Sequence, residues 1–419
     1  MLKKSNKLIA LTVIDFFIAL SLVLSCGSIL DNINSFSFYI TEILLIILII
    51  RIVLCKNEFK TKKMNFKPLF LLVAFQFTYT LVQFFNQTMS IIASISFIIK
   101  IVGIIGSLFI LFQLEGKTLF KKYLKYFANI VLAISCISLF FYIFGSYFKL
   151  IPPTNQVELN FGFVRKVDSY FWIYFEPQYT LFNGTYILRN CGIFAEGPMF
   201  SIVLTIALAY NLFLNEKVSK PKIILLIITI VTSISLTGIL LMTFALVIKA
   251  VFFTLKKYQN QIKMHRTFVI SFMVIFSIVI CAIILPLIVD KIFSLSFRMR
   301  IDDYIAGFKA WLDHPFFGNG YLNYDSVEKY MLISRRGGQS NSLTNLMAEG
   351  GLWQVSFYFI PYIINLINLI RKNEKEKIVF LLVLFLLFST TIFTYSSCIL
   401  FFIAYGWYLV YSKKREENN

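Results

Sequence analysis

Arginines beside the ends of apolar segments are the residues whose placement most clearly indicates chemistry. A guanidinium binds phosphate oxygens through two parallel hydrogen bonds, which a lysine ammonium cannot do. Such arginines lie in two long segments between apolar runs: Arg189, Arg298, Arg300, Arg335 and Arg336. We expect them to bind phosphate groups, either of a substrate or of anionic lipid headgroups.

Carboxylates and one histidine in the same segments could accept the proton of an attacking hydroxyl group. The candidates for this role are Glu196, His314 and Glu349, together with Asp302 and Asp303. Each also has a structural interpretation. His314 can cap the turn before Pro315, Glu349 can stabilise its own loop, and Glu196 can hold Arg189 in place. The sequence leaves open which residue is the base, or whether one is required.

The composition excludes most other classes of protein. Of the 419 residues, 58% are hydrophobic and 15% are charged, with a mean hydropathy of +0.77. A soluble domain is roughly one-quarter charged, so the chain is neither a soluble globule nor disordered. The net charge of +19 comes from lysines and arginines in short runs between apolar segments, which the positive-inside rule explains better than nucleic-acid binding.

The sequence gives no sign of a metal or cofactor. The two histidines are far apart, and the six cysteines are scattered without a CxxC pair. No Walker loop, dinucleotide fingerprint or DxD-type metal motif is present. We therefore expect no cofactor.

The apolar runs predict about twelve transmembrane helices, because each needs roughly 20 apolar residues. The predicted spans are 8–30, 36–55, 68–86, 90–113, 127–148, 198–214, 223–234, 236–255, 267–289, 352–370, 378–394 and 397–412. Two long stretches are split at the small and polar residues 233–238 and 394–397. Most basic residues then lie in short segments on one side, so both termini are expected in the cytoplasm. Ten or eleven spans are the alternative counts.

The chain divides into three membrane parts and two long extracytoplasmic loops. We expect transmembrane helices in 1–148, 198–289 and 352–419, with loops at 149–197 and 290–351. Long ordered loops usually carry function. The first loop is rich in aromatic residues, so it should lie on the membrane surface or pack on the second loop. In the second loop, one helix face is predicted from Ile301, Tyr304, Ile305, Phe308, Trp311 and Leu312.

Several charged residues fall within predicted spans, among them Asp15, Arg51, Lys100 and Lys249. Charges inside a membrane usually have a partner or a function, so a pairing of Asp15 with Lys100 is one hypothesis. Arg51 and Lys249 lie near the cytoplasmic ends of their spans. We expect both side chains to extend to the membrane surface.

Two motifs in 290–351 resemble those of the bacterial O-antigen ligase and polysaccharide polymerase (Wzy) family. The run 313–320 (DHPFFGNG) is similar to the family's hPl-G-x-G signature, and Arg300 and Tyr304 precede it at the family's spacing. The family's downstream Asn, Glu and Gly are matched by Asn341, Glu349 and Gly351. The glycines of these motifs also suit turns and helix caps.

Two further motifs lie upstream, in the same order as in the family. The run 189–198 (RNCGIFAEGP) resembles the family's R-x-x-G-x-f-x-E-P sequence, with which a span begins. The run 235–238 (SLTG) resembles the S-R-T-G start of a helix. Together the four motifs cover residues 185 to 355.

Three residues depart from the family pattern. Ser340 stands where many members, the ligases above all, have the His of an HN pair. Leu236 replaces the Arg of S-R-T-G, and Gly197 is inserted between Glu196 and Pro198. The missing His favours the polymerase branch of the family.

The resemblance implies an all-α polytopic membrane protein of about 12 helices, GT-C-like, with helical extracytoplasmic loops. It implies a metal-independent glycosyltransferase in the bacterial cytoplasmic membrane that polymerises undecaprenyl-pyrophosphate-linked repeat units of a capsule, exopolysaccharide or O-antigen. The arginines named above would bind the pyrophosphate, and Ser340 and Asn341 would bind the acceptor sugar. Membrane lipid, a chain-length regulator and a flippase would be its partners, and nucleic acid would not.

Two other functions stay open. An O-antigen ligase would use the same donor and a different acceptor. A flippase or transporter of the lipid-linked unit would need polar residues along its central helices and usually internal repeats. In this chain the polar and charged candidate residues lie in the two long loops instead, and no internal repeat is visible.

Overall fold

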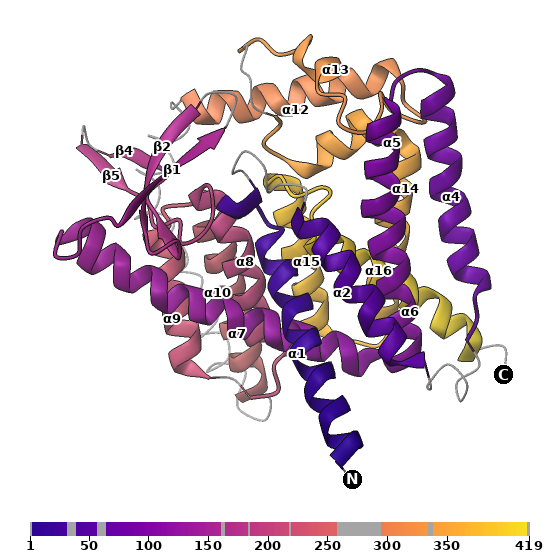
Figure 1. Cartoon of the computed structure of the whole chain (residues 1–419), viewed down its shortest axis with the longest axis horizontal. Coiled ribbons are helices and arrows are strands. Elements are labelled where there is room, and N and C mark those ends of the chain that lie inside the picture. Colours follow the sequence, from indigo (N-terminus) through magenta and orange to yellow (C-terminus); the bar gives the residue numbers. More distant parts are fainter. Residues whose placement is uncertain are drawn as a thin grey trace.

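The computed structural model shows a helical bundle that carries a small region of strands at one end (Figure 1). The structure describes residues 2–31, 39–56, 64–160, 164–182, 185–217, 219–257, 295–333 and 338–416. Within these ranges, seven helices are long and apolar enough to cross a membrane. The protein is therefore a mainly helical membrane protein. Both termini lie at one end of the bundle, the terminal end, and the strands and α12 lie at the other, the strand end (Figure 1).

The first half of the chain forms helices that alternate between the two ends of the bundle. These are α1 (Leu2–Leu24), η1 (Ile29–Asp31), α2 (Tyr39–Leu54), α4 (Lys67–Phe85), α5 (Ile91–Phe97), η2 (Ile98–Ile104), α6 (Ile105–Glu115), α7 (Lys117–Phe141) and η3 (Tyr142–Tyr147). The second half contains α8 (Gly197–Ala209), η4 (Tyr210–Leu214), α9 (Lys220–Thr232), α10 (Leu236–Lys257), α12 (Leu295–Asp313), α13 (Asp325–Glu328), α14 (Ser342–Arg371), α15 (Lys375–Thr390) and α16 (Ser397–Glu416).

The helices occupy every predicted span that the structure describes, while the predicted span 267–289 lies outside the described residues. Both predicted breaks are confirmed. The chain leaves the helix between Thr232 and Leu236, where Ile234 has a φ of 49°. It leaves the helix again between Thr390 and Ser397. The total number of spans stays a prediction.

The first long loop contains strands, so the expectation that both long loops are helical is wrong for this loop. A three-stranded antiparallel sheet contains β1 (Asn155–Asn160), β2 (Val164–Tyr170) and β3 (Tyr174–Phe175), and β4 (Tyr179–Phe182) pairs with β5 (Thr185–Leu188). The alternation of the sequence explains this outcome, because Val157, Leu159 and Val167 point to one face and pack on Ile29 and Met199.

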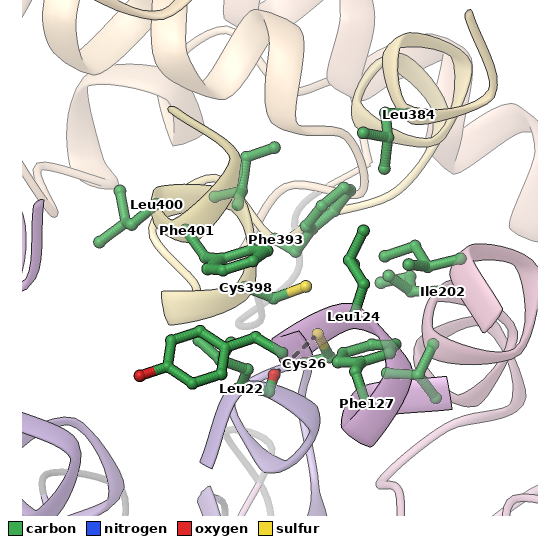
Figure 2. Close-up of a cluster of buried hydrophobic side chains, with 14 of the residues drawn as sticks. Leu22, Cys26, Leu124, Phe127, Ile202, Leu384, Phe393, Cys398, Leu400 and Phe401 are labelled. Atoms are coloured by element: carbon green, nitrogen blue, oxygen red, sulfur yellow. Dashed lines mark hydrogen bonds between the residues drawn. The ribbon is translucent and has the colours of Figure 1, made fainter. Parts of the chain in front are cut away.

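Five helices meet in the apolar core shown in Figure 2. Leu22 comes from α1, and Leu124 and Phe127 come from α7. Ile202 of α8 and Leu384 of α15 close the cluster on one side, and Phe401 of α16 closes it on the other. All six side chains are buried, so this core fixes the positions of the helices that carry the motif residues at the strand end.

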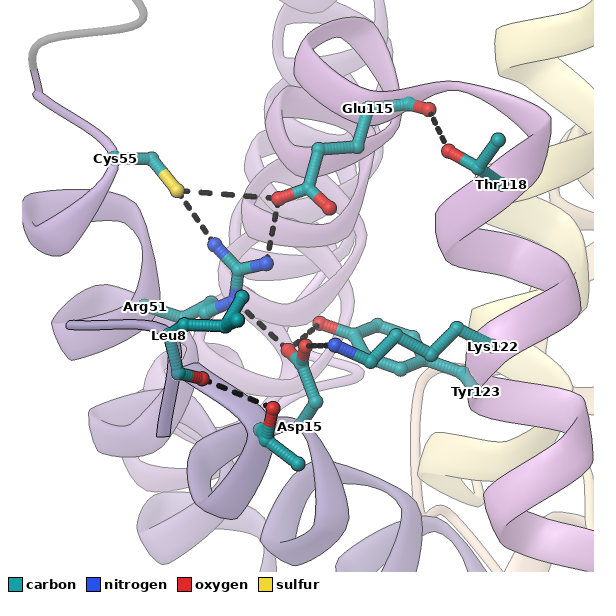
Figure 3. A network of polar contacts seen from close by, with 9 residues as sticks. Leu8, Asp15, Arg51, Cys55, Glu115, Thr118, Lys122 and Tyr123 are labelled. Carbon is teal, nitrogen blue, oxygen red and sulfur yellow. Dashed lines mark hydrogen bonds and ion pairs between the residues drawn. The ribbon is translucent and has the colours of Figure 1, made fainter. Parts of the chain in front are cut away.

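A buried network of charges joins α1, α2, α6 and α7 (Figure 3). The Asp15 carboxylate accepts hydrogen bonds from Arg51 Nε at 2.8 Å, Lys122 Nζ at 2.6 Å and the Tyr123 hydroxyl at 3.0 Å. Arg51 also pairs with Glu115 at 2.5 Å. The hypothesis of an Asp15–Lys100 pair is therefore wrong, because Arg51 and Lys122 neutralise this aspartate.

The expectation that Arg51 extends to the membrane surface is also wrong. Only 2% of its side chain is exposed, because two carboxylates from neighbouring helices hold it inside the bundle. Lys249 forms an ion pair at 2.7 Å with Glu376 of α15. Buried charges survive in an apolar protein only when their partners are supplied in this way.

We predict that Arg51→Met will destabilise the protein strongly. The substitution keeps the volume of the side chain but leaves Glu115 without a cation and Asp15 with Lys122 as its only cation. Breaking a buried pair in this way costs about 3–5 kcal/mol. Lys121→Met is the matched control, because Lys121 forms its ion pair with Glu216 in an exposed position. Unfolding of both variants in detergent would test this, and equal stability of the two would contradict the role of the network.

Candidate functional site

Arg189 lies in the connection from β5 to α8. Its side chain contacts the short non-helical segment between α9 and α10. Its side chain is buried, and its Nε and Nη2 donate hydrogen bonds of 3.0 Å to the carbonyl oxygens of Ser233 and Ile234. The break frees these carbonyls from helical hydrogen bonds. Arg189 therefore joins the first long loop to the start of α10, where the SLTG motif lies.

The inserted Gly197 is explained by this contact. A Cβ atom at this position would lie 2.6 Å from the Ser233 carbonyl oxygen and 2.8 Å from Arg189 Nε. No other residue fits such an approach without moving the backbone. The departure from the family pattern thus lets α8 begin directly against the Arg189 guanidinium.

Arg300 and Tyr304 bind the C-terminal end of α15. Arg300 Nη1 donates hydrogen bonds to the Thr390 carbonyl at 3.2 Å and to Thr237 Oγ1 at 3.4 Å. The Tyr304 hydroxyl donates to the Ser389 carbonyl. A cation is favourable here, because the last carbonyls of a helix carry partial negative charge. Three of the four motifs therefore meet where α10, α12 and α15 come together.

Glu196 completes what we call the arginine cluster, defined as Arg189, Glu196 and Arg300. Burial raises the pKa of the Glu196 carboxyl, although the charges of both arginines act to lower it. Burial also lowers the pKa of both guanidiniums, and the charge of Arg300 lowers the pKa of Arg189 further. A buried cation, Arg189, and a half-buried one, Arg300, thus act electrostatically on one half-buried carboxylate, and within the described ranges Arg189 Nη1 makes no hydrogen bond. The cluster is suited to an anion.

The apolar face of α12 is exposed, contrary to the usual arrangement of an amphipathic helix. The predicted helix is confirmed, but Ile305, Phe308 and Leu312 are 43%, 46% and 55% exposed. The opposite face is buried and consists of Asp302, Asp303, Ala306, Gly307 and Ala310. Small residues are needed there because α14 approaches closely, so that a Cβ at Gly307 would lie 2.8 Å from Thr344 Cβ.

An apolar groove follows this exposed face of α12. It has a volume of about 530 Å³ and is lined by Tyr304, Ile305, Phe308, Lys309, Leu312 and Thr344. Arg300, Tyr304 and Phe308 are four residues apart, so they form one stripe along the helix. The groove therefore begins beside the arginine cluster and continues along a surface that suits a hydrocarbon chain.

Asp302 and Asp303 hold the second long loop rather than facing a cavity. Asp302 accepts hydrogen bonds of 3.0 Å from the backbone N–H groups of Leu332 and Ile333. Asp303 accepts one of 3.0 Å from the N–H of Ser340. Of the sequence candidates for the base, these two have a structural role here.

The DHPFFGNG run packs against the first part of α14. Asn319 N–H and Gly320 N–H donate to the carbonyls of Ala348 and Glu349 at 2.8 and 3.0 Å. Gly351 has a φ of 58°, and a Cβ there would lie 2.5 Å from the Gly318 nitrogen. The motif glycines are therefore required by a close backbone contact, as the structural interpretation of the sequence expects.

Glu349 stabilises this same turn. Its carboxylate accepts hydrogen bonds from the Leu322 N–H at 3.2 Å and from Asn345 Nδ2 at 2.9 Å. Its carbonyl accepts one from the Tyr79 hydroxyl at 2.8 Å. The side chain is buried, and both carboxylate oxygens already accept hydrogen bonds. The contacts of Glu349 favour its structural interpretation over a catalytic one.

Three consecutive residues before α14 carry buried polar atoms without partners. Asn341 caps the helix, because its Oδ1 accepts a hydrogen bond of 2.9 Å from the Thr344 N–H. Its Nδ2, the Ser340 hydroxyl and both side-chain polar atoms of Gln339 have no hydrogen-bond partner among the described residues. Buried polar atoms are nearly always paired, so an unpaired group of them marks a place where a ligand or a water molecule can bind.

We call residues 339–341 the polar shelf. Sequence reasoning identified Ser340 and Asn341 but missed Gln339, which has no counterpart in the motif. The end of α15 connects the shelf to the arginine cluster. The Thr390 carbonyl accepts a hydrogen bond from Arg300, and the next carbonyl, that of Thr391, accepts from the N–H and the hydroxyl of Ser342, which follows the shelf. The Ser342 hydroxyl is therefore occupied.

The remaining candidates are dispersed. His314 and Arg298 are exposed on the surface of the loop, and the structure does not bring either into hydrogen-bond contact with the arginine cluster. Arg335 and Arg336 lie outside the described residues. The site that the structure assembles thus consists of the arginine cluster, the apolar groove and the polar shelf.

We predict that Glu196 makes stability depend on pH. Since burial raises its pKa in the folded protein, the folded state holds this proton more tightly than the unfolded chain. Stability should therefore fall as pH rises through the interval above the ordinary value of about 4.5. Glu196→Gln removes the titration, so the difference in melting temperature between variant and parent should grow in favour of the variant. A constant difference between pH 4.5 and pH 7 would contradict the burial argument.

Comparison with known proteins identifies no relative of this chain. No protein-family model, no curated protein and no solved structure matches the chain. The resemblance to the O-antigen ligase and polymerase family therefore depends on the motif residues, and the function that it implies is a proposal.

Proposed function

We propose that this protein is a glycosyltransferase that polymerises undecaprenyl-pyrophosphate-linked oligosaccharide repeats in the bacterial cytoplasmic membrane. The observation that carries the proposal is the arginine cluster beside the apolar groove. A lipid-linked donor has a pyrophosphate joined to a long hydrocarbon chain. A buried guanidinium, Arg189, and a half-buried one, Arg300, at the head of an apolar stripe match both parts of such a molecule.

The charge of the cluster suits the chemistry of the leaving group. In the proposed step, an oxygen of the acceptor sugar attacks the anomeric carbon of the donor, and the bond from that carbon to the pyrophosphate breaks. Negative charge then develops on the pyrophosphate oxygens, where Arg189 and Arg300 stabilise it. The guanidiniums are already ordered by the Ser233, Ile234 and Thr390 carbonyls, so they need little reorganisation.

We propose Glu196 as the residue that accepts the proton of the attacking hydroxyl group. The charges of both arginines act on its carboxyl, and burial raises its pKa towards the range in which a base works at neutral pH. The polar shelf supplies hydroxyl and amide groups for an acceptor sugar, with Ser340 in the position of the family's His. An acceptor held by hydrogen bonds depends less on an imidazole base.

The proposed orientation places the strand end outside the cell and both termini in the cytoplasm. The short basic segments at the terminal end support it, since positive charge is retained on the cytoplasmic side. Lipid-linked repeats reach the outer leaflet through a separate flippase, and a chain-length regulator would act on the product. Both are therefore proposed as partners, together with membrane lipid.

We predict that Arg189→Lys and Arg300→Lys will each abolish most long-chain polymer at normal protein levels. Lysine keeps the charge but loses the planar fork that binds two carbonyls or phosphate oxygens. Each lost contact should remove about 2–3 kcal/mol of transition-state stabilisation. Arg165→Lys is the matched control, because Arg165 lies on β2 and forms no hydrogen bond or ion pair with the three described residues of the cluster. Normal polymer from both cluster variants would reduce these arginines to structural residues.

We predict that the purified protein will make a ladder of longer chains when given only lipid-linked repeats, with a chelator and without nucleotide. Deletion of the gene should leave single repeats on the carrier or at the cell surface. Transfer of preformed chains to a different acceptor, without a ladder, would identify a ligase instead. Lipid-linked repeats trapped in the cytoplasmic leaflet of the deletion strain would identify a flippase and refute both enzymes.

A further inference from the structure

A second, larger cavity opens at the terminal end of the bundle, away from the arginine cluster. It has a volume of about 1290 Å³ and lies among α7, η4, α14, α15 and α16. Sites for small molecules usually measure about 300–1,000 Å³, so this cavity exceeds the size needed for a drug-sized ligand. None of the motif residues of the candidate site lines it, and the proposed polymerase chemistry does not use it.

The deep part of the cavity is apolar and aromatic. Its walls include Tyr358 and Tyr362 of α14, Phe385 and Phe388 of α15, and Tyr405 of α16. Along α15 the lining runs from Lys377 to Phe388, which corresponds to about 16 Å at 1.5 Å per residue. The cavity thus extends through roughly half of a hydrocarbon core that is about 30 Å thick.

The mouth of the cavity is basic. The acidic residues at the mouth each have a lysine partner: Glu216 pairs with Lys121, Glu374 with Lys377, and Glu376 with Lys249. Further lysines line the cavity and form no ion pair with any residue in the described ranges: Lys117, Lys125, Lys217, Lys222 and Lys372. An excess of positive charge is therefore left at the mouth, beside the apolar interior.

We propose that this cavity binds one lipid whose phosphate headgroup has a net negative charge, taken from the membrane leaflet at the terminal end. Its hydrocarbon chains would occupy the aromatic interior, and its phosphate would lie among the lysines at the mouth. A soluble anion would use only the mouth and leave the apolar walls uncovered. A neutral lipid would use only the interior and leave the lysines without a counter-ion. An anionic lipid satisfies both parts.

The binding test uses the whole protein purified in a neutral detergent and examined by native mass spectrometry. Phosphatidylglycerol, phosphatidylcholine and inorganic phosphate are the three probes. We expect one phosphatidylglycerol to remain bound at concentrations at least tenfold below those that phosphatidylcholine requires, and no displacement by millimolar inorganic phosphate. Equal retention of the two lipids, loss of the lipid to inorganic phosphate, or no retained lipid would each overturn the proposal.

Variants of the mouth and the interior locate the bound lipid. Lys222→Gln combined with Lys372→Gln should weaken retention of phosphatidylglycerol at least tenfold. Leu381→Trp should block the apolar part for both lipids. The matched control is Lys56→Gln with Lys256→Gln, two exposed lysines that do not line the cavity. Equal weakening in the control and in the mouth variant would mean nonspecific attraction and would overturn the site.

The result is independent of the polymerase proposal. Arg300→Lys alters the arginine cluster and leaves the cavity unchanged, so it should retain phosphatidylglycerol as the parent does. If Arg300→Lys lost the lipid while the mouth variant kept it, the lipid would lie at the arginine cluster and the cavity proposal would be wrong. Loss of polymer with retained lipid would leave the cavity proposal intact.

Discussion

The carbonyl groups freed by two helix breaks are the constraint around which the strand end is organised. A backbone carbonyl in an apolar environment must find a donor, because water is not at hand to supply one. At the break between α9 and α10 the donor is Arg189, and at the end of α15 the donors are Arg300, Tyr304 and Ser342. The long loops are therefore tied to the bundle by the same residues that form the candidate site.

This arrangement explains how a buried cation, Arg189, and a half-buried one, Arg300, can stay within electrostatic range of each other. Each guanidinium has part of its hydrogen-bonding capacity used by carbonyls, which hold it in place, and part left over. Glu196 supplies only one negative charge for both arginines, and burial already disfavours all three charges. Such a cluster lowers the stability of the fold locally. Destabilising charge arrangements of this kind are common at functional sites.

The sequence predicted what depends on local pattern and failed where distant segments meet. Hydropathy located the helices, and the small residues near Ser233 and Thr394 located both breaks. The motifs identified Arg189, Glu196 and Arg300 as candidate site residues. The partners of Asp15 could not be predicted, because Arg51 and Lys122 lie on other helices and their approach depends on helix packing.

The strands of the first loop and the orientation of α12 were missed for a similar reason. The stretch 155–170 alternates in polarity over only a few residues within an aromatic loop, which is a weak signal beside the spans. In α12 the pattern correctly predicted a helix, but the buried face is the one with Ala306, Gly307 and Ala310. Backbone proximity to α14 selected small residues over large apolar ones. Gln339 carried no signal, because only its burial without a partner distinguishes it.

The outward apolar face of α12 has a consequence for the protein outside its membrane. Ile305, Phe308 and Leu312 are not part of a transmembrane helix, so a detergent belt wide enough for the spans alone would leave them in water. Exposed apolar patches of this kind are where copies of a protein adhere. Self-association of the solubilised protein should therefore begin at α12, and detergents or nanodiscs should be chosen for how well they cover this helix.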